Sequence, residues 1–94
     1  MFTLEFVGHL GADPVEDTTR REVSFSVAVD NGFSKEGTRL TRWVYCHSHV
    51  SNPLPELGKG AKVWVKGVPR WSWRKNGDDV DIFLHVSIVL VVLV

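Results

Sequence analysis

The segment RLTRWVYCHSHV, residues 39–50, decides the fold because it is typical of one long β-strand with two chemically different faces. Successive side chains of a strand point to opposite faces. One parity is mostly small or apolar and predicts a core-facing side: Leu40, Arg42, Val44, Cys46, Ser48 and Val50. The other parity offers rings and hydrogen-bonding groups: Thr41, Trp43, Tyr45, His47 and His49. This row indicates a platform for stacking, and the alternative is that Trp43 and Tyr45 are core residues of a strand buried on both sides.

Four more strands are predicted by the same alternation, over residues 2–10, 20–30, 59–70 and 80–94. Gly8 falls on the apolar parity of the first of them, which indicates a bend or a close backbone approach. Gly67 and Pro69 are expected to bend or end the strand at 59–70. Gly and Pro predict connecting loops over residues 11–19 and 51–58, with room for at most one turn of helix in the second.

Two hairpins are expected where Asn-Gly occurs, at residues 31–32 and 76–77. The second places Trp71 and Trp73 in a hairpin loop. In the last strand, residues 80–94, every even-numbered residue is aliphatic, and Val89, Val91 and Leu93 make the far end apolar on the other parity as well. An open apolar edge of this kind aggregates, so a second subunit is expected to cover it, and cover from within the chain is the alternative.

Five strands without a substantial helix predict an all-β fold, with a small barrel as the best fit, in one domain spanning residues 1–94. The single cysteine, Cys46, excludes an internal disulfide and fits a reducing compartment. No basic and apolar leader is present, so a cytoplasmic location is expected. The apolar run at residues 86–94 is too short to span a bilayer as a helix, and no membrane association is expected.

The formal net charge is zero, but its distribution is uneven. Residues 33–75 contain nine Lys and Arg against two acidic residues, a sum of +7, and the two flanks sum to −7. Within this segment, residues 59–75 combine six basic residues with three tryptophans and no acid. Cations suit phosphate and rings suit unpaired bases, so this composition predicts binding of single-stranded nucleic acid with loose sequence preference. Phe33, in the first hairpin beside Lys35 and Arg39, is expected to face such a ligand.

Metal and catalytic sites are not predicted. Cys46 points away from His47 and His49, and two histidines do not make a metal site. The acidic cluster at Asp78, Asp79 and Asp81 lies at a hairpin tip, where such charges are usually solvated. The sequence offers no Ser-His-Asp arrangement for nucleophilic catalysis and no glycine-rich loop that could bind a phosphate. No enzyme activity and no cofactor are therefore expected.

The chain resembles the bacterial-type single-stranded DNA-binding proteins, which have an OB-fold. The resemblance is carried by residues 8–14 (GHLGADP), 24–29 (SFSVAV), 41–43 (TRW) and 59–67 (KGAKVWVKG), in the family order over the whole chain. It implies a five-stranded OB-fold barrel with long hairpins and little helix, working in DNA replication, recombination or repair at the nucleoid. It also implies stacking at Trp43, at Phe33 and at Trp73 or Trp71, a DNA contact at His49, phosphate contacts at Arg42, Arg70 and Arg74, and a homotetramer or homodimer.

The residues and the resemblance together predict a DNA-binding set: Phe33, Lys35, Arg39, Arg42, Trp43, Tyr45, His47, His49, Lys66, Arg70, Trp71, Trp73, Arg74 and Lys75. The chain departs from the family at Val44, where histidine is common, and in its reduced connector at 51–58. The family's acidic C-terminal tail is not found, so recruitment of repair enzymes through a tail is not expected. The alternatives are a replication-restart accessory protein resembling primosomal replication protein B, binding of RNA, and an OB-fold assembly module that binds no nucleic acid.

Overall fold

The computed structural model describes residues 1–94 as six β-strands joined by turns and loops. The strands are β1 (Leu4–Leu10), β2 (Val15–Asp17), β3 (Glu22–Phe33), β4 (Arg39–His49), β5 (Lys62–Asn76) and β6 (Asp79–Leu93). None of the chain forms a helix of the length and hydropathy needed to cross a membrane. The five strands predicted from the sequence correspond to β1, β3, β4, β5 and β6 and are confirmed. The loop predicted over residues 11–19 is wrong in its middle, where β2 pairs with β3.

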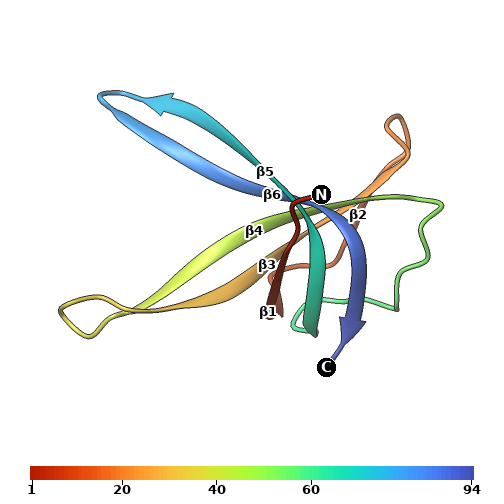
Figure 1. Ribbon diagram of the computed structural model, residues 1–94, viewed down its shortest axis with the longest axis horizontal. Coiled ribbons are helices and arrows are strands. Elements are labelled where there is room, and N and C mark those ends of the chain that lie inside the picture. The colour runs from red at the N-terminus through yellow and green to blue at the C-terminus, as the bar shows by residue number, and fades with distance from the viewer.

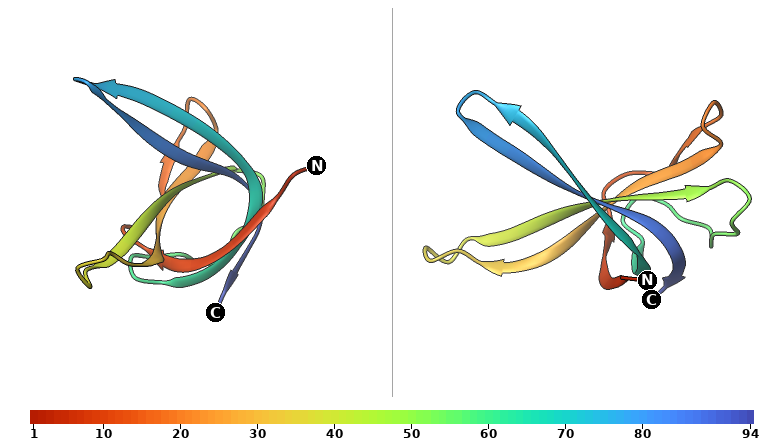
Figure 2. Two further views of the ribbon diagram at one scale, coloured as in Figure 1. Left: turned by 60° about the vertical axis from the view of Figure 1, so that its left-hand side comes forward. Right: turned by 45° about the horizontal axis from the view of Figure 1, so that its top comes forward.

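Five of the strands close into a barrel, which Figure 2 shows end-on in its left view. The order around the sheet is β1-β5-β6-β4-β3, and the ring closes where His9 and Leu10 of β1 pair with Ala28 and Val27 of β3. Every pairing is antiparallel except that of β4 with β6. This is the connectivity of an OB-fold, and it confirms the fold class predicted from the sequence.

The core is built by the alternation that predicted the strands. Ten apolar side chains fill the barrel, and Val27, Cys46, Val63, Val65 and Val86 are fully buried among them. On β4, Val44, Cys46 and Ser48 face inward, while Trp43 on the other parity is exposed and Tyr45 and His47 are partly exposed. The alternative in which Trp43 and Tyr45 belong to the core is therefore wrong. Within the barrel, β4 therefore has one buried face and one solvent-exposed face.

Gly8 and Gly67 let neighbouring strands approach closely. A Cβ at Gly8 would come within 2.6 Å of Val27 Cγ1 and would also collide with the Ala28 carbonyl oxygen, which confirms the predicted close approach. At Gly67 a Cβ would collide with Val86 and the Ser87 carbonyl oxygen. β5 has a register shift between Lys66 and Gly67 and then continues to Asn76. Gly67 and Pro69 therefore bend the strand without ending it.

β6 contains a bulge that reverses its inward parity. Ile88 pairs with Gly67 and Leu90 pairs with Lys66, so Val89 is an extra residue without a partner. Beyond it Val91 becomes the core residue, 6% exposed, while Leu90 is 49% exposed. The even-numbered parity of β6 therefore faces the core only as far as Ile88. The bulge leaves an exposed apolar patch on the barrel wall, made up of Val7, Val89, Leu90 and Val92.

Two arms extend beyond the barrel. The β3–β4 hairpin and the β5–β6 hairpin leave it as separate two-stranded ribbons that diverge toward their tips (Figure 1). The tips carry glycines with positive φ, Gly37 in the first arm and Gly77 in the second, and Gly32 has a positive φ at the irregular end of β3. Since only the bases of the arms are held by the barrel, both faces of each ribbon are open to solvent.

Candidate nucleic-acid interface

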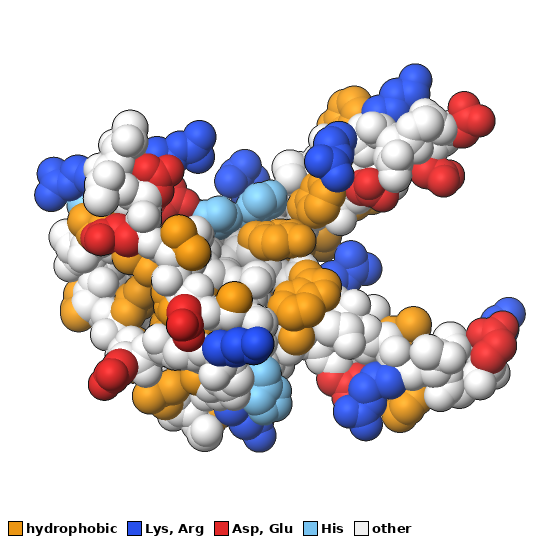
Figure 3. Space-filling view, turned by 180° about the vertical axis from the view of Figure 1, so that it is seen from behind, with side chains coloured by type: hydrophobic (Ala, Val, Ile, Leu, Met, Phe, Trp, Pro, Cys, Tyr) orange, Lys and Arg blue, Asp and Glu red, His pale blue; other side chains and the backbone are white.

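A continuous outer face runs across β4, β6 and β5. Tyr45 pairs with His85, and His85 pairs in turn with Arg70, so these three side chains lie on one side of the sheet. The same register aligns Phe83 with Ser72. We call this surface the ring face, and its members are Trp43, Tyr45, His47, Arg70, Ser72, Arg74, Phe83 and His85. The ring face lies where the two arms meet the barrel, and hydrophobic and histidine side chains gather there in Figure 3.

The rings of this face contact one another in sequence. The Tyr45 ring centroid lies 6.1 Å from that of Phe83 and 5.6 Å from that of His85, and both pairs are tilted. The His85 and His47 rings meet edge to edge, with centroids 5.2 Å apart and planes inclined by 23°. The Arg74 guanidinium lies 5.6 Å from the Phe83 ring centroid, a cation–π distance. The packing holds each ring in place, so the platform exists before any ligand arrives.

Trp43 stands at the edge of the platform with 44% of its surface exposed. It contributes with Arg42, Tyr45 and Ile82 to a pocket of about 200 Å³ between the bases of the two arms, which Thr41 and Phe83 also line. A pocket of this size lined by aromatic carbons can accept the edge of a flat ring.

Trp71 and Trp73 do not belong to the ring face. Both lie on β5 itself, so the prediction that they sit in a loop is wrong. Trp71 pairs with Leu84 and Trp73 with Ile82, which places both on the continuation of the barrel's inner face along the arm. No core covers that continuation, so Trp71 is 62% and Trp73 71% exposed. They line an apolar pocket of about 430 Å³ with Ser72, Val80 and Ile82.

The remaining predicted residues are distributed over the arms and the barrel wall. Phe33 is exposed near the tip of the β3–β4 arm, and the Arg39 guanidinium lies 5.7 Å from its ring centroid. Lys35 is exposed in the same tip. Lys75 pairs with Val80 and so shares the tryptophan side of the other arm. Lys66 is separate from all of these, because its cross-strand neighbours are Glu5 and Leu90 on the barrel wall.

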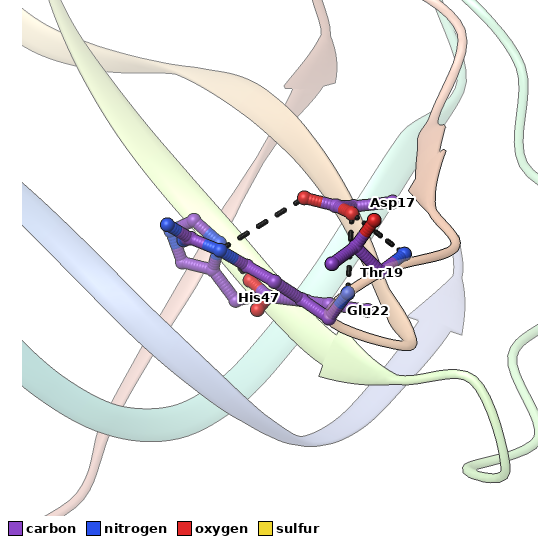
Figure 4. Close-up of polar contacts among 5 residues, drawn as sticks. Asp17, Thr19, Glu22 and His47 are labelled. Carbon is purple, nitrogen blue, oxygen red and sulfur yellow. Dashed lines mark hydrogen bonds and ion pairs between the residues drawn. The ribbon is translucent and has the colours of Figure 1, made fainter.

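His49 ends the row on β4 and opens toward a polar pocket of about 300 Å³. Its Nδ1 accepts a hydrogen bond from the Ser51 backbone N–H at 3.1 Å. The pocket is lined mostly by charged and polar residues: Arg20, Arg21, Glu22, His47, Ser48, His49, Asn52 and Ser87, with Ile88 the one apolar member. Figure 4 shows Glu22 beside His47, with the Asp17 carboxylate turned to the Thr19 backbone.

The lysines and arginines of the predicted DNA-binding set form no ion pairs. The close side-chain ion pairs of the chain are Arg20 with Asp17 at 3.9 Å and His47 with Glu22 at 2.6 Å. No lysine or arginine of the predicted DNA-binding set takes part in one. Such cations lose no acidic partner when an anion approaches. Burial, the Arg70 guanidinium and the neighbouring His47 all lower the pKa of His85.

Three members of the ring face were not predicted from the sequence: Ser72, Phe83 and His85. Phe83 and His85 occupy the non-core parity of the last strand, so the alternation did indicate that they face outward. Nothing local indicates that this strand pairs in parallel with β4, which is what brings His85 beside Tyr45.

No protein-family model and no curated protein matches the sequence. Solved structures match over nearly the whole chain. A small single-stranded DNA-binding protein from Streptomyces coelicolor aligns with a TM-score of 0.74 at 18% identity, covering 98% of this chain and 93% of that one. The mitochondrial single-stranded DNA-binding protein Rim1 of S. cerevisiae gives 0.70 at 20% identity, with coverage of 98% and 93%. The Plasmodium falciparum SSB in complex with single-stranded DNA gives 0.71 at 14% identity, with coverage of 100% and 95%. The shared property at these identities is the fold.

Proposed function

We propose that this chain binds single-stranded DNA without strong sequence preference and protects it during replication, recombination or repair. The observation that carries the proposal is the ring face itself, where the aromatic rings of Trp43, Tyr45 and Phe83 lie close together. Arg70 and Arg74 lie on the same face and form no ion pair with an acidic side chain. Proteins of the same fold named for single-stranded DNA binding support it.

Stacking and charge neutralisation are the two forces involved. Each base stacked on an aromatic side chain contributes about 1–3 kcal/mol, and every base has such a face, so this contribution tolerates any sequence. Arginines and lysines along the arms neutralise phosphates and release counterions, which makes the affinity salt-dependent. A two-stranded ribbon can also enter the major groove of a duplex, but exposed rings at the bases of the arms fit unpaired bases better, because the bases of a duplex are already stacked on one another.

In this proposal the chain is a binding protein and carries no catalytic residue. A role as an accessory protein in replication restart uses the same binding surface and is the alternative process. An assembly module that ignores nucleic acid would have no need for exposed rings, and Trp43, Trp71 and Trp73 are all exposed. That alternative is therefore the weaker account.

We further propose that the chain forms a homodimer or homotetramer through its barrel wall. The exposed patch of Val7, Val89, Leu90 and Val92 is apolar and lies away from the ring face on β1 and the far half of β6. The adjoining edge of β1 is also open over Leu4–Gly8, because β3 pairs only with His9 and Leu10. Leu90→Glu should lower the mass measured by light scattering, and an unchanged mass would contradict this interface.

The function is tested by titrating the four tryptophans' fluorescence with a thymidine oligomer at low and moderate salt. Strong quenching is expected, with an affinity that falls as salt rises. A duplex of equal length is the control and should quench weakly, because its bases are already stacked on one another. An unchanged spectrum with the single strand at low salt would overturn the proposal.

A further inference from the structure

A chain of polar side chains crosses the ring face and links four strands. Glu22 of β3 lies 2.6 Å from His47 Nδ1 of β4. On its other side, His47 Nε2 lies 2.9 Å from His85 Nδ1 of β6. His85 Nε2 lies in turn 3.0 Å from the Ser72 hydroxyl of β5. Three of the four ring nitrogens thus have hydrogen-bond partners within one row, whereas His47 Nδ1 makes no hydrogen bond and meets Glu22 only as a close charge contact.

The row has one consistent arrangement of hydrogens when both histidines are neutral. A lone pair on His47 Nδ1 would repel the Glu22 carboxylate at this distance, so Nδ1 carries the hydrogen. His47 Nε2 is then an acceptor, and His85 Nδ1 donates to it. His85 Nε2 is left as the acceptor for the Ser72 O–H. The carboxylate sets the tautomer of both rings.

The same geometry allows the pair to hold one added proton but not two. With one, His47 Nε2 donates to His85 Nδ1, and His85 Nε2 donates to Ser72, whose oxygen can accept. A second proton would set two N–H groups against each other across 2.9 Å. The low pKa of His85, which burial, Arg70 and His47 cause, agrees with this limit.

The charges around the His47–His85 pair determine how an added proton on the pair would affect the binding of an anion. Glu22 approaches it from β3 and Arg70 from β5, while Arg20, Arg21 and His49 line the adjoining pocket. Tyr45, whose ring lies beside His85, and Asp17, which pairs with Glu22 from β2, are further titratable neighbours. While the pair is neutral, Glu22 leaves a negative charge on the ring face that opposes a phosphate. An added proton cancels it.

We propose that the His47–His85 pair is a phosphate subsite of the DNA path that takes up one proton together with the phosphate. The inference rests on the proposed function and adds to it that DNA binding is coupled to the uptake of one proton. Affinity for single-stranded DNA then rises as pH falls through the range in which histidine pairs titrate, and falls again as pH rises. Cancelling one unit charge near a phosphate at the surface corresponds to about a fivefold gain in affinity.

The test measures binding of a thymidine oligomer from pH 5.5 to 8 at constant salt, and calorimetry at pH 7 in two buffers of different ionisation enthalpy. The wild-type protein should bind about fivefold more tightly at the acid end, and the buffer dependence should report net proton uptake. His47→Gln should bind with little pH dependence, whereas His9→Gln, on the exposed face of β1, should behave as the wild type. Glu22→Gln should raise the affinity at pH 8 by removing the opposing charge.

Tight binding with no proton uptake would overturn the subsite while leaving DNA binding intact. Equal pH dependence in His47→Gln and the wild type would do the same. Loss of binding at every pH would overturn the proposed function and the subsite together. The two-buffer measurement needs no variant, so the result does not depend on whether His47→Gln folds.

Discussion

The indole of Trp43 lies directly against Gly11, so closely that a Cβ at this glycine would approach Trp43 Cζ3 to 2.6 Å and Cη2 to 2.7 Å. Gly11 is fixed in turn by its N–H, which donates to the Ser26 carbonyl oxygen at 3.1 Å. The backbone therefore cannot yield to a larger side chain, and the indole must move instead. The loop after β1 thus braces the edge of the ring face.

Gly11→Ala is expected to displace Trp43 and weaken binding of a thymidine oligomer about three- to tenfold. This loss corresponds to part of the free energy that one base gains by stacking on an aromatic side chain. The variant should still unfold cooperatively, because Trp43 is no part of the core. Fluorescence titration and thermal unfolding measure the two effects. Gly58→Ala is the matched control, since its Cβ would meet only Asp13 Oδ1 at 3.6 Å. Equal affinities for the two variants would show that the contact does not position the indole.

Trp43→Ala and Trp73→Ala should differ in their dependence on DNA length, because the two rings lie on opposite sides of the sheet. Trp43→Ala should weaken the binding of short and long thymidine oligomers alike, by about 1–3 kcal/mol. Trp73→Ala should affect only oligomers long enough to pass around the β5–β6 arm. Affinities measured over a series of lengths give the comparison. The mass of Trp43→Ala in light scattering should match the wild type, and unfolding of this variant would show that Trp43 supports the core.

Gly8→Ala should destabilise the barrel by about 1–3 kcal/mol, the usual cost of overpacking, because the added methyl group would meet Val27 and the Ala28 carbonyl. Urea unfolding followed by circular dichroism measures the loss. His9→Ala, one residue further along on the exposed side of β1, is the control and should stay within about 0.5 kcal/mol of the wild type. A wild-type midpoint for Gly8→Ala would mean that β1 can move away from β3 at no cost.

Cys46 should resist alkylation in the folded protein, because burial raises the pKa of its thiol to about 12. In the unfolded chain the pKa of the thiol is about 8.5. Between these values only the unfolded state loses the proton, so rising pH should lower the stability by about 1.4 kcal/mol per unit.

The difference between the wild type and Cys46→Ala in urea unfolding from pH 8 to 10.5 isolates this effect, since all other groups are shared. Parallel curves for the two proteins over this range would contradict the raised pKa. Rapid labelling of native protein at pH 8 would show that the thiol is accessible.

Local patterns were sufficient for most of the fold. The two-residue period of a strand acts within the strand, so it indicated a core-facing parity with Val44 and Cys46 and an outer parity with Trp43 and Tyr45. Leu40 and Arg42 share the core-facing parity but are exposed, because that end of β4 lies in the arm beyond the barrel. Asn-Gly placed the tip of the β5–β6 hairpin, whereas Asn31-Gly32 lies in the irregular end of β3 and the first tip follows it at residues 34–38. β2 was missed because three exposed residues, Val15–Asp17, are too few to show a period.

The sequence by itself determined the strands, their wet and dry faces, the barrel and the group of rings and cations from which the site is drawn. Only the tertiary structure decided which of these side chains share a surface. The parallel pairing of β4 with β6 joins Tyr45 to His85 across forty residues of chain, and no local pattern encodes such a partner. The bulge at Val89 reverses the inward parity in a run that is apolar on both sides, where alternation carries no information. Trp71 and Trp73 are separated from Trp43 for a related reason, because their side of the arm is set by pairing with Leu84 and Ile82 on β6.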